Sequence, residues 1–175
     1  MTQIALTGTP GTGKTTVADL VEAQLDVEVL HLNDAIREAD LFAERDVERD
    51  SLVADLDAVE SWVQAETADD GKTLVESHLS HLLAVDRVIV LRCHPEELKP
   101  RLRERGESEA SVAENAESEA LDVILAEAVE RHGEDDVWEI DTTDRSPEAV
   151  ADDVKAAVES EMPPRVGVVD FIEYL

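Results

Sequence analysis

The stretch GTPGTGKT, residues 8–15, constrains the fold of this chain more than any other part of the sequence. It matches the pattern G-x-x-x-x-G-K-[ST] of phosphate-binding loops. An apolar run of strand type (4–7) precedes it, and an apolar face at helical spacing (15–25) follows it. An ordinary glycine-rich turn would not need this strand-loop-helix context, whereas a phosphate-binding loop requires it. We therefore expect a nucleoside triphosphate as the first ligand.

The chemistry of such a loop assigns roles to two of its residues. Backbone N–H groups curl inward toward phosphate oxygens, and the N-terminus of the following helix adds positive potential. Lys14 is expected to reach the β- and γ-phosphates, and the Thr15 hydroxyl to ligate Mg²⁺.

Composition then narrows the class of protein. The chain has 175 residues, enough for one domain with a real core, and we expect a single domain over 1–175. It carries 43 acidic against 15 basic residues, a formal charge of −28, yet its 43% hydrophobic content and clear periodicity argue against a disordered acidic chain. The charge indicates an acidic, halophilic surface, which salt at about 1 M would screen beyond roughly 3 Å. It argues against a direct nucleic-acid partner and is compatible with a basic protein partner.

The cysteine content, and the search for signal-peptide and membrane-spanning patterns, predict the compartment in which the protein works. Cys93 is the only cysteine, so no internal disulfide can form and a reducing interior fits. No signal-peptide pattern and no membrane-spanning apolar run is present, so we expect a cytoplasmic protein with no membrane partner. The histidines at 31, 81 and 132 have no metal-ligand spacing with each other or with Cys93, and we expect no structural metal.

Strand-like and helical segments alternate along the chain. Strands are predicted at 4–7, 27–32, 73–76, 88–92 and 137–141. Helices are predicted at 15–25, 34–41, 52–66, 95–104, 112–131 and 147–160. This alternation predicts an α/β fold: a five-stranded parallel sheet with helices on both faces, whose ligands lie beyond the carboxyl ends of the strands.

Two candidate residues follow the second predicted strand. Arg37 could grip a second phosphorylated substrate with its guanidinium fork, or could be an ordinary surface arginine. Asp34, in the same segment, could cap a helix.

Two more candidates follow the third strand. Glu76 ends an apolar run, as the acid of a Walker B motif does, and could hold Mg²⁺ through water, although that acid is normally Asp. His78 could orient a nucleophile or move a proton, or could simply begin a helix.

A cluster of cations follows the fourth strand. Arg101 and Arg105 are four residues apart and share a helical face, so they could close over a transferring phosphoryl group as part of a short lid. A solvated, salt-bridged face is the alternative. Pro100 is expected to kink this helix. The apolar tail over 162–175 is expected to pack back on the domain, or to serve as a partner-binding strand.

Together these motifs resemble the atypical adenylate kinase family called adenylate kinase isoenzyme six or the nuclear coiled-body ATPase-interacting type. The resemblance covers nearly the whole chain, and the acidic composition is similar to that of a haloarchaeal member. It rests on four segments in this order: LTGTPGTGKTT, Asp34-Ala35-Ile36-Arg37-Glu38, Glu76-Ser77-His78, and LRCHPEELKPRLRERG followed by Asn115-x-x-x-Glu119. The family usually has Asp where Glu76 stands, and the DGFPR-type segment of ordinary adenylate kinases is absent.

The resemblance implies a nucleoside monophosphate kinase fold and Mg²⁺-dependent phosphoryl transfer from ATP to AMP. It also implies ATP hydrolysis and a role in maturation of the small ribosomal subunit, in complex with one of its proteins. The implied acceptor-binding segment is about 33–60, with Asp34 and Arg37 toward AMP, and the implied lid is about 101–115. Residues 141–147 would lie near adenine, and we expect a monomer or weak dimer. The residues implied for ATP are Gly8, Pro10, Gly11, Thr12, Gly13, Lys14, Thr15 and Thr16.

Three functions remain open on the sequence. One is an adenylate kinase with ATPase activity. Another is a nucleotide-gated ribosome assembly factor in which AMP chemistry is incidental. The last is a different small-molecule kinase of similar fold, such as a shikimate or nucleoside kinase.

Overall fold

The computed structural model describes residues 1–46, 51–67 and 70–175. Its main sheet has five parallel strands in the order β2-β5-β1-β6-β7, as the sequence predicts. The strands are β1 (Thr2–Gly8), β2 (Glu28–His31), β5 (Lys72–Glu76), β6 (Arg87–Arg92) and β7 (Val137–Asp141). Strand β1 is the middle strand, so the loop that follows it leaves the centre of the sheet's carboxyl edge.

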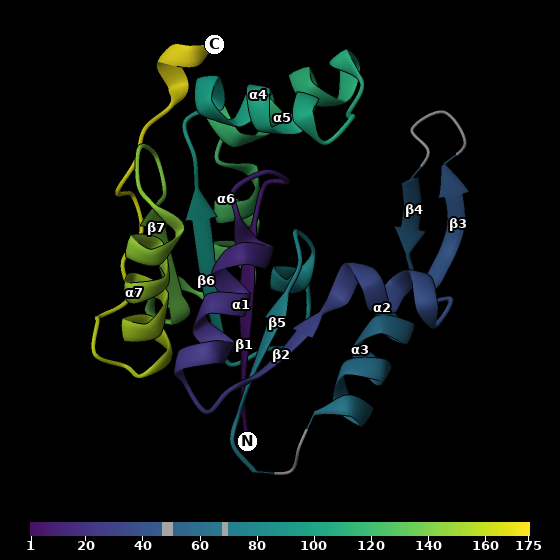
Figure 1. Ribbon diagram of the computed structural model, residues 1–175. Coiled ribbons are helices and arrows are strands. Elements are labelled where there is room, and N and C mark those ends of the chain that lie inside the picture. The colour runs from purple at the N-terminus through teal and green to yellow at the C-terminus, as the bar shows by residue number, and fades with distance from the viewer. Residues whose placement is uncertain (47–50, 68–69) are drawn as a thin grey trace.

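Helices cover both faces of this sheet (Figure 1). On one face α1 (Lys14–Gln24) and α7 (Pro147–Val158) enclose the largest apolar cluster, which includes Leu6, Val21 and Val154. On the other face α6 (Val123–His132) packs on β6 and β7. Helices α2 (Leu32–Glu38) and α3 (Leu56–Glu66) form a third cluster against β5.

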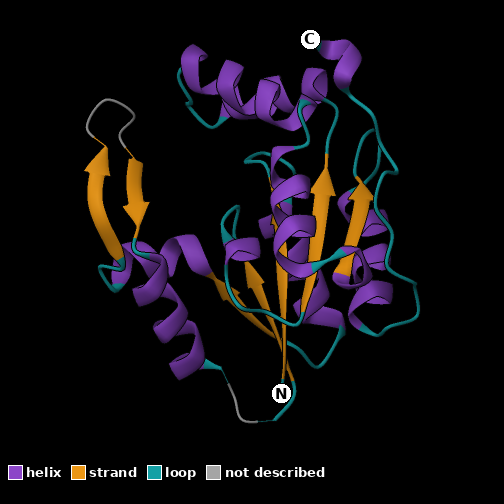
Figure 2. Cartoon of the chain, turned by 180° about the vertical axis from the view of Figure 1, so that it is seen from behind, coloured by secondary structure: helices purple, strands orange, loops and turns teal. Residues whose placement is uncertain are grey.

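Two helices lie across the carboxyl end of the sheet, above the first loop (Figures 1 and 2). They are α4 (Pro95–Glu104) and α5 (Glu109–Ala120). Buried Cys93, Leu98, Leu102 and Val112 form a small core between them and the end of β6. Helix α4 has the predicted bounds and continues through Pro100.

A hairpin replaces the beginning of one predicted helix. Strands β3 (Phe42–Asp46) and β4 (Ser51–Ala54) pair antiparallel as a separate two-stranded sheet. The prediction of a helix over 52–66 is therefore wrong for its first residues. Asp55 caps α3, since its carboxylate accepts a hydrogen bond from the Ala58 N–H at 3.2 Å. Residues 47–50 lie outside the described part of the chain.

The predicted helix over 112–131 is also wrong, because it is two helices. Ser108 caps α5, which begins three residues earlier than predicted, and Asp122 separates α5 from α6 with a left-handed φ of 56°. Aspartate adopts this backbone conformation more readily than most residues, because its side chain can hydrogen-bond locally. Helix α2 differs as well, since it begins at Leu32 and ends at Glu38, which places Asp34 in its first turn rather than at its cap.

The C-terminal tail packs back on the domain, as one of the two interpretations predicts. Arg165 pairs with β7, and the Trp138 indole N–H donates to the Met162 carbonyl at 2.9 Å. Phe171 is buried and contacts the Arg92 guanidinium and the ring of His94, the residue before α4. None of the helices in the described residues is both long and apolar enough to cross a bilayer.

Candidate active site

Two glycines shape the loop over residues 8–15. A Cβ at Gly8 would lie 2.7 Å from the Leu91 carbonyl oxygen, which belongs to the neighbouring strand β6. Gly11 has a φ of 93°, and a Cβ there would meet the Leu98 and Leu102 side chains of α4 at 3.0 and 3.2 Å. The loop therefore passes close to β6 and α4 because it lacks side chains at these two positions.

Lys14 lies inside this loop and is 7% exposed. Its ammonium donates to the Gly8 carbonyl at 2.9 Å and to the Thr9 carbonyl at 3.2 Å. Burial lowers its pKa to about 8, with Arg105 adding to the shift, while Glu76 and Glu119 oppose it. A polyphosphate in the loop would favour the charged form, so the ammonium is poised to gain interactions when a nucleotide binds.

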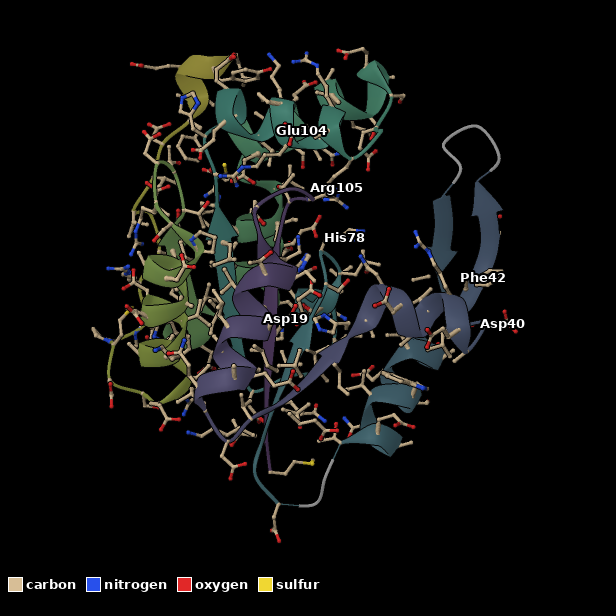
Figure 3. All side chains as sticks on the ribbon, in the orientation of Figure 1. Asp19, Asp40, Phe42, His78, Glu104 and Arg105 are labelled. Carbon is tan, nitrogen blue, oxygen red and sulfur yellow. The ribbon has the colours of Figure 1, made fainter. Side chains whose placement is uncertain are left out.

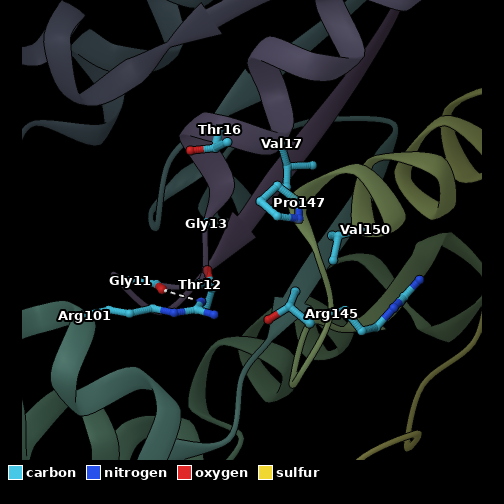
Figure 4. Close-up of a pocket in the computed structure, with 10 residues that line it drawn as sticks. Gly11, Thr12, Gly13, Thr16, Val17, Arg101, Arg145, Pro147 and Val150 are labelled. Atoms are coloured by element: carbon cyan, nitrogen blue, oxygen red, sulfur yellow. Dashed lines mark hydrogen bonds between the residues drawn. The ribbon is translucent and has the colours of Figure 1, made fainter.

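A cavity of about 310 Å³ lies beside the loop (Figure 4). It extends from the loop to α7, and its far end has the apolar side chains of Pro147 and Val150. Four of the residues predicted to hold ATP line it, together with Arg101; the four are Gly11, Thr12, Gly13 and Thr16. Thr142 and Arg145, from the segment predicted to lie near adenine, line the same cavity. Pro10 and Thr15 stand in the loop outside this lining, with Thr15 exposed at the beginning of α1.

Glu76 belongs to a chain of three hydrogen-bonded side chains that the sequence did not reveal. Its Oε2 lies 2.8 Å from His31 Nδ1, and His31 Nε2 lies 3.1 Å from Asp19 Oδ1. Burial opposes the charged form of His31, but the bonds and charges of Glu76 and Asp19 outweigh it and raise the pKa of His31. The register of the sheet brings these two residues together, because His31 pairs with Glu76 where β2 and β5 both end.

His78 is half-buried in the turn that follows β5, not at a helix start. Its pKa is lowered to about 4, first by burial and then by the positive charges of Lys14, His81 and Arg105. The imidazole is therefore neutral at pH 7 and close to the loop lysine. Figure 3 shows His78 and Arg105 at the same end of the sheet, above Asp19.

The three arginines of the 101–105 segment lie in different surroundings. Arg101 donates to the Gly11 carbonyl at 3.2 Å, so α4 touches the loop directly. Arg105 ends α4, is exposed, and its charge acts on both Lys14 and His78. Arg103 points to α5, where Glu109 accepts two hydrogen bonds from its guanidinium at 2.9 and 3.1 Å. The structure therefore brings Arg101 and Arg105 toward the loop and holds Arg103 away from it.

The predicted acceptor residues lie on the other side of the loop, in α2. Asp34 and Arg37 are both exposed, in the first and last turn of that helix. Beside them the Asn33 amide accepts a hydrogen bond from the Ser77 hydroxyl at 2.8 Å, which ties the start of α2 to the end of β5. The structure thus places Asp34 and Arg37 near the carboxyl edge without bringing them into the cavity described above.

A buried charge cluster supports the loop from behind. Glu119 of α5 is 3% exposed and accepts from the Thr9 hydroxyl at 2.5 Å and from Arg92 Nε at 2.6 Å. Arg92 also donates to Glu139 at 3.0 Å and to Asp122 at 2.5 Å. A buried charge without partners costs several kcal/mol, and in this cluster the buried charges are paired, linking α5, β6 and β7 to the loop through Thr9. The sequence offered only the Asn115-x-x-x-Glu119 spacing as a sign of it.

The residues at hand fit a magnesium ion held largely by phosphate and water. Thr15 and Glu76 supply hard oxygen donors, which Mg²⁺ prefers. Within residues 1–46, 51–67 and 70–175, no group of three or more acids, histidines or cysteines converges as a metal cage. Mg²⁺ in nucleotide sites characteristically keeps several waters and binds one or two side chains plus substrate phosphates, which two donors satisfy.

Comparison with known proteins gives a matching family model, a set of similar proteins and a shared fold. The model of the AAA domain family matches residues 4–122. A protein of Natronomonas pharaonis named "Putative adenylate kinase" is 58% identical over 173 residues, 99% of each chain. Proteins of the same name from Halobacterium salinarum and Methanocaldococcus jannaschii are 48% and 38% identical, over 99% and 98% of this chain and 99% and 93% of their own. A crystal structure of shikimate kinase from Bacteroides thetaiotaomicron is 16% identical with a TM-score of 0.57, covering 90% of this chain and 98% of that one, which shows the shared fold.

Proposed function

This chain belongs to the family of those archaeal nucleotide kinases, and from that premise we propose that it is an Mg²⁺-dependent adenylate kinase. One observation carries the proposal: the lysine loop and the arginines of α4 meet at one end of the sheet. Arg101 contacts the loop carbonyl of Gly11, and the Arg105 charge reaches Lys14. Such an arrangement suits a reaction in which negative charge is spread over a transferring phosphoryl group.

In this proposal ATP binds in the loop and the adjoining cavity. The bond between the γ-phosphorus and the β–γ bridging oxygen breaks, a phosphate oxygen of AMP bonds to that phosphorus, and two ADP result. Lys14 and Arg105 neutralise the oxygens of the transferring group, and Asp34 and Arg37 hold AMP. Thr15, and Glu76 through a water, would hold Mg²⁺, which would supply positive charge to offset that of the phosphates. His31 fixes the Glu76 carboxylate for this task, with Asp19 behind it.

The activity is tested by offering different acceptors to one enzyme. The chain is incubated with ATP and Mg²⁺ in molar KCl with AMP, with shikimate, or with no acceptor, and nucleotides are separated by chromatography. The proposal predicts two ADP for each AMP consumed and no phosphorylated shikimate. ADP formation that is indifferent to AMP, or transfer to shikimate, contradicts it.

The proposal extends to slow ATP hydrolysis and to an assembly role with a basic protein of the small ribosomal subunit. Two observations support this extension: half-buried His78 stands close to Lys14, where it could orient a water, and the net charge of −28 suits a cationic partner. Phosphate release without AMP should fall when His78→Ala is introduced, while transfer to AMP changes less. A purified basic ribosomal protein should change that release at high salt; polylysine of similar charge serves as the control for nonspecific attraction.

A further inference from the structure

Glu97, in the first turn of α4, joins two elements that lie far apart in the sequence. Its Oε1 accepts from Arg101 Nη2 at 2.7 Å, and its Oε2 accepts from the backbone N–H of Asp144 at 3.0 Å. An acid and an arginine four residues apart on a helix form a common surface pair of small worth. The second bond is different, because it crosses from α4 to the loop between β7 and α7, a separation of 47 residues.

These hydrogen bonds connect the β7–α7 loop, through α4, to the phosphate-binding loop beside the cavity. Arg101 Nη1 donates to the Gly11 carbonyl at 3.2 Å, so contacts run without a break from Asp144 through Glu97 and Arg101 to Gly11. Arg101 lines the cavity, and so do Thr142 and Arg145 of the same β7–α7 loop; Figure 4 labels Arg101 and Arg145. The side chain of Glu97 itself is 28% exposed and stands behind Arg101 rather than in the cavity lining.

We propose that Glu97 is a positioning residue for the nucleotide, acting by holding the Arg101 guanidinium over the cavity and the β7–α7 loop at a fixed distance from it. This inference rests on the proposed function, because it takes the cavity as the ATP site. A free arginine loses much rotational freedom when it binds a ligand, and a carboxylate that already fixes its plane removes part of that cost. The Arg101 charge is also partly offset by Glu97.

The position of Glu97 predicts an effect on affinity rather than on the chemical step. In Glu97→Gln the side chain keeps its shape, but its NH₂ group can only donate, so it loses either the arginine or the Asp144 N–H. We expect the Kd for ATP with Mg²⁺, measured by calorimetry without AMP, to rise about fivefold, the net worth of one ordinary hydrogen bond. The kcat at saturating ATP and AMP should stay within about twofold of wild type. Glu96→Gln is the matched control, since Glu96 is exposed and, among the residues that the structure describes, its carboxylate pairs with Lys99 alone, at 3.4 Å.

A double-mutant cycle decides whether Glu97 acts through Arg101. In an Arg101→Ala background, Glu97→Gln should change the Kd for ATP by less than about twofold, because its partner is gone. An effect of Glu97→Gln no larger than that of Glu96→Gln overturns the inference, as does a fivefold effect that persists without Arg101. If the wild-type protein binds ATP but the variants do not show the expected changes in Kd, the inference about Glu97 fails and the proposed function stands. If the wild-type protein binds no ATP, the proposed function fails as well.

Discussion

The two sides of the proposed reaction are built differently. On the donor side, which comprises the phosphate-binding loop, α4 and the β7–α7 loop, side chains of α4 and α5 are already hydrogen-bonded to the phosphate-binding loop, and Glu97 of α4 to the β7–α7 loop. On the acceptor side, which comprises α2 and the β3–β4 hairpin, Asp34 and Arg37 are exposed, and the hairpin stands apart from α4 and α5 in both views (Figures 1 and 2). The difference indicates a donor site formed before the nucleotide arrives and an acceptor site completed when its ligand binds.

The loss of the loop lysine should have the largest effect. Lys14→Ala removes the only side-chain charge inside the loop, and we expect kcat for ADP formation to fall by about 10⁴-fold. Stability should be preserved, because burial already opposes the charged form of this lysine. Turnover by coupled assay, with circular dichroism as the check on folding, measures both. Lys72→Ala is the control and should leave turnover unchanged, because Lys72 begins β5, at the end of that strand opposite to Glu76. Substantial turnover by a folded Lys14→Ala protein removes the basis for the donor side.

The arginines of α4 give the next largest effect and discriminate between a lid and a solvated face. Arg105→Ala should lower kcat by about 10³-fold with less effect on the Kd for ATP, because the arginine meets charge that develops in the transition state. Arg103→Ala should lower kcat by less than about threefold, since its guanidinium is bound to Glu109 on the far side. Equal, small losses at both positions would show that this cluster is a solvated face.

The alkylation rate of Cys93 measures how tightly α4 packs on the donor side. Its thiol is fully buried between β6 and α4, and burial raises its pKa to about 12. At pH 8 we expect alkylation by iodoacetamide to be at least about a hundredfold slower in the native protein than in urea. In the native protein the reagent cannot reach the sulfur, and the thiol stays protonated and therefore unreactive. Mass spectrometry gives the two rates, and ATP with Mg²⁺ should slow the native rate further. Equally fast labelling in the native state would mean that α4 is not packed on the loop.

Arg37 gives the smallest effect and tests the acceptor side. Arg37→Ala should raise the KM for AMP about tenfold, as expected for one lost charge-assisted contact, and leave the Kd for ATP unchanged. Arg131→Ala, an exposed arginine of α6, is the matched control. An unchanged KM for AMP would place the acceptor elsewhere on the chain.

The phosphate-binding loop of the donor side was predictable because its residues form one continuous stretch of the sequence. The loop pattern, the strand before it and the helix after it are local, so the fold class and the place of Lys14 inside the loop follow from the sequence alone, while the roles of Lys14 and Thr15 toward phosphate and Mg²⁺ stay predictions. Glu97, Glu119 and His31 were not assigned roles, because each acts through a partner that only the folded chain brings near. The partners are Asp144, Thr9 and Glu76, which lie 45 to 110 positions away.

The acceptor side was predicted less well because local signals conflicted. Leu52 and Val53 were read as the first turn of a helix, although Asp55 is a capping residue that places the start of α3 after it. The same kind of error also occurred outside the acceptor side, where α5 was joined to α6, although Asp122 turns the chain and binds Arg92 instead of continuing the helix. In both places a capping or turn residue outweighed the apolar periodicity around it.

The most direct test of the account is whether one ligand can bind both sides at once. Two adenosines joined by five phosphates combine ATP and AMP in a single molecule, and calorimetry in molar KCl with Mg²⁺ gives its Kd and stoichiometry. The account predicts one molecule per chain, a Kd at least about a hundredfold lower than that of ATP, and weakening by both Lys14→Ala and Arg37→Ala. A Kd no lower than that of ATP, and unaffected by Arg37→Ala, would contradict a shared site for donor and acceptor.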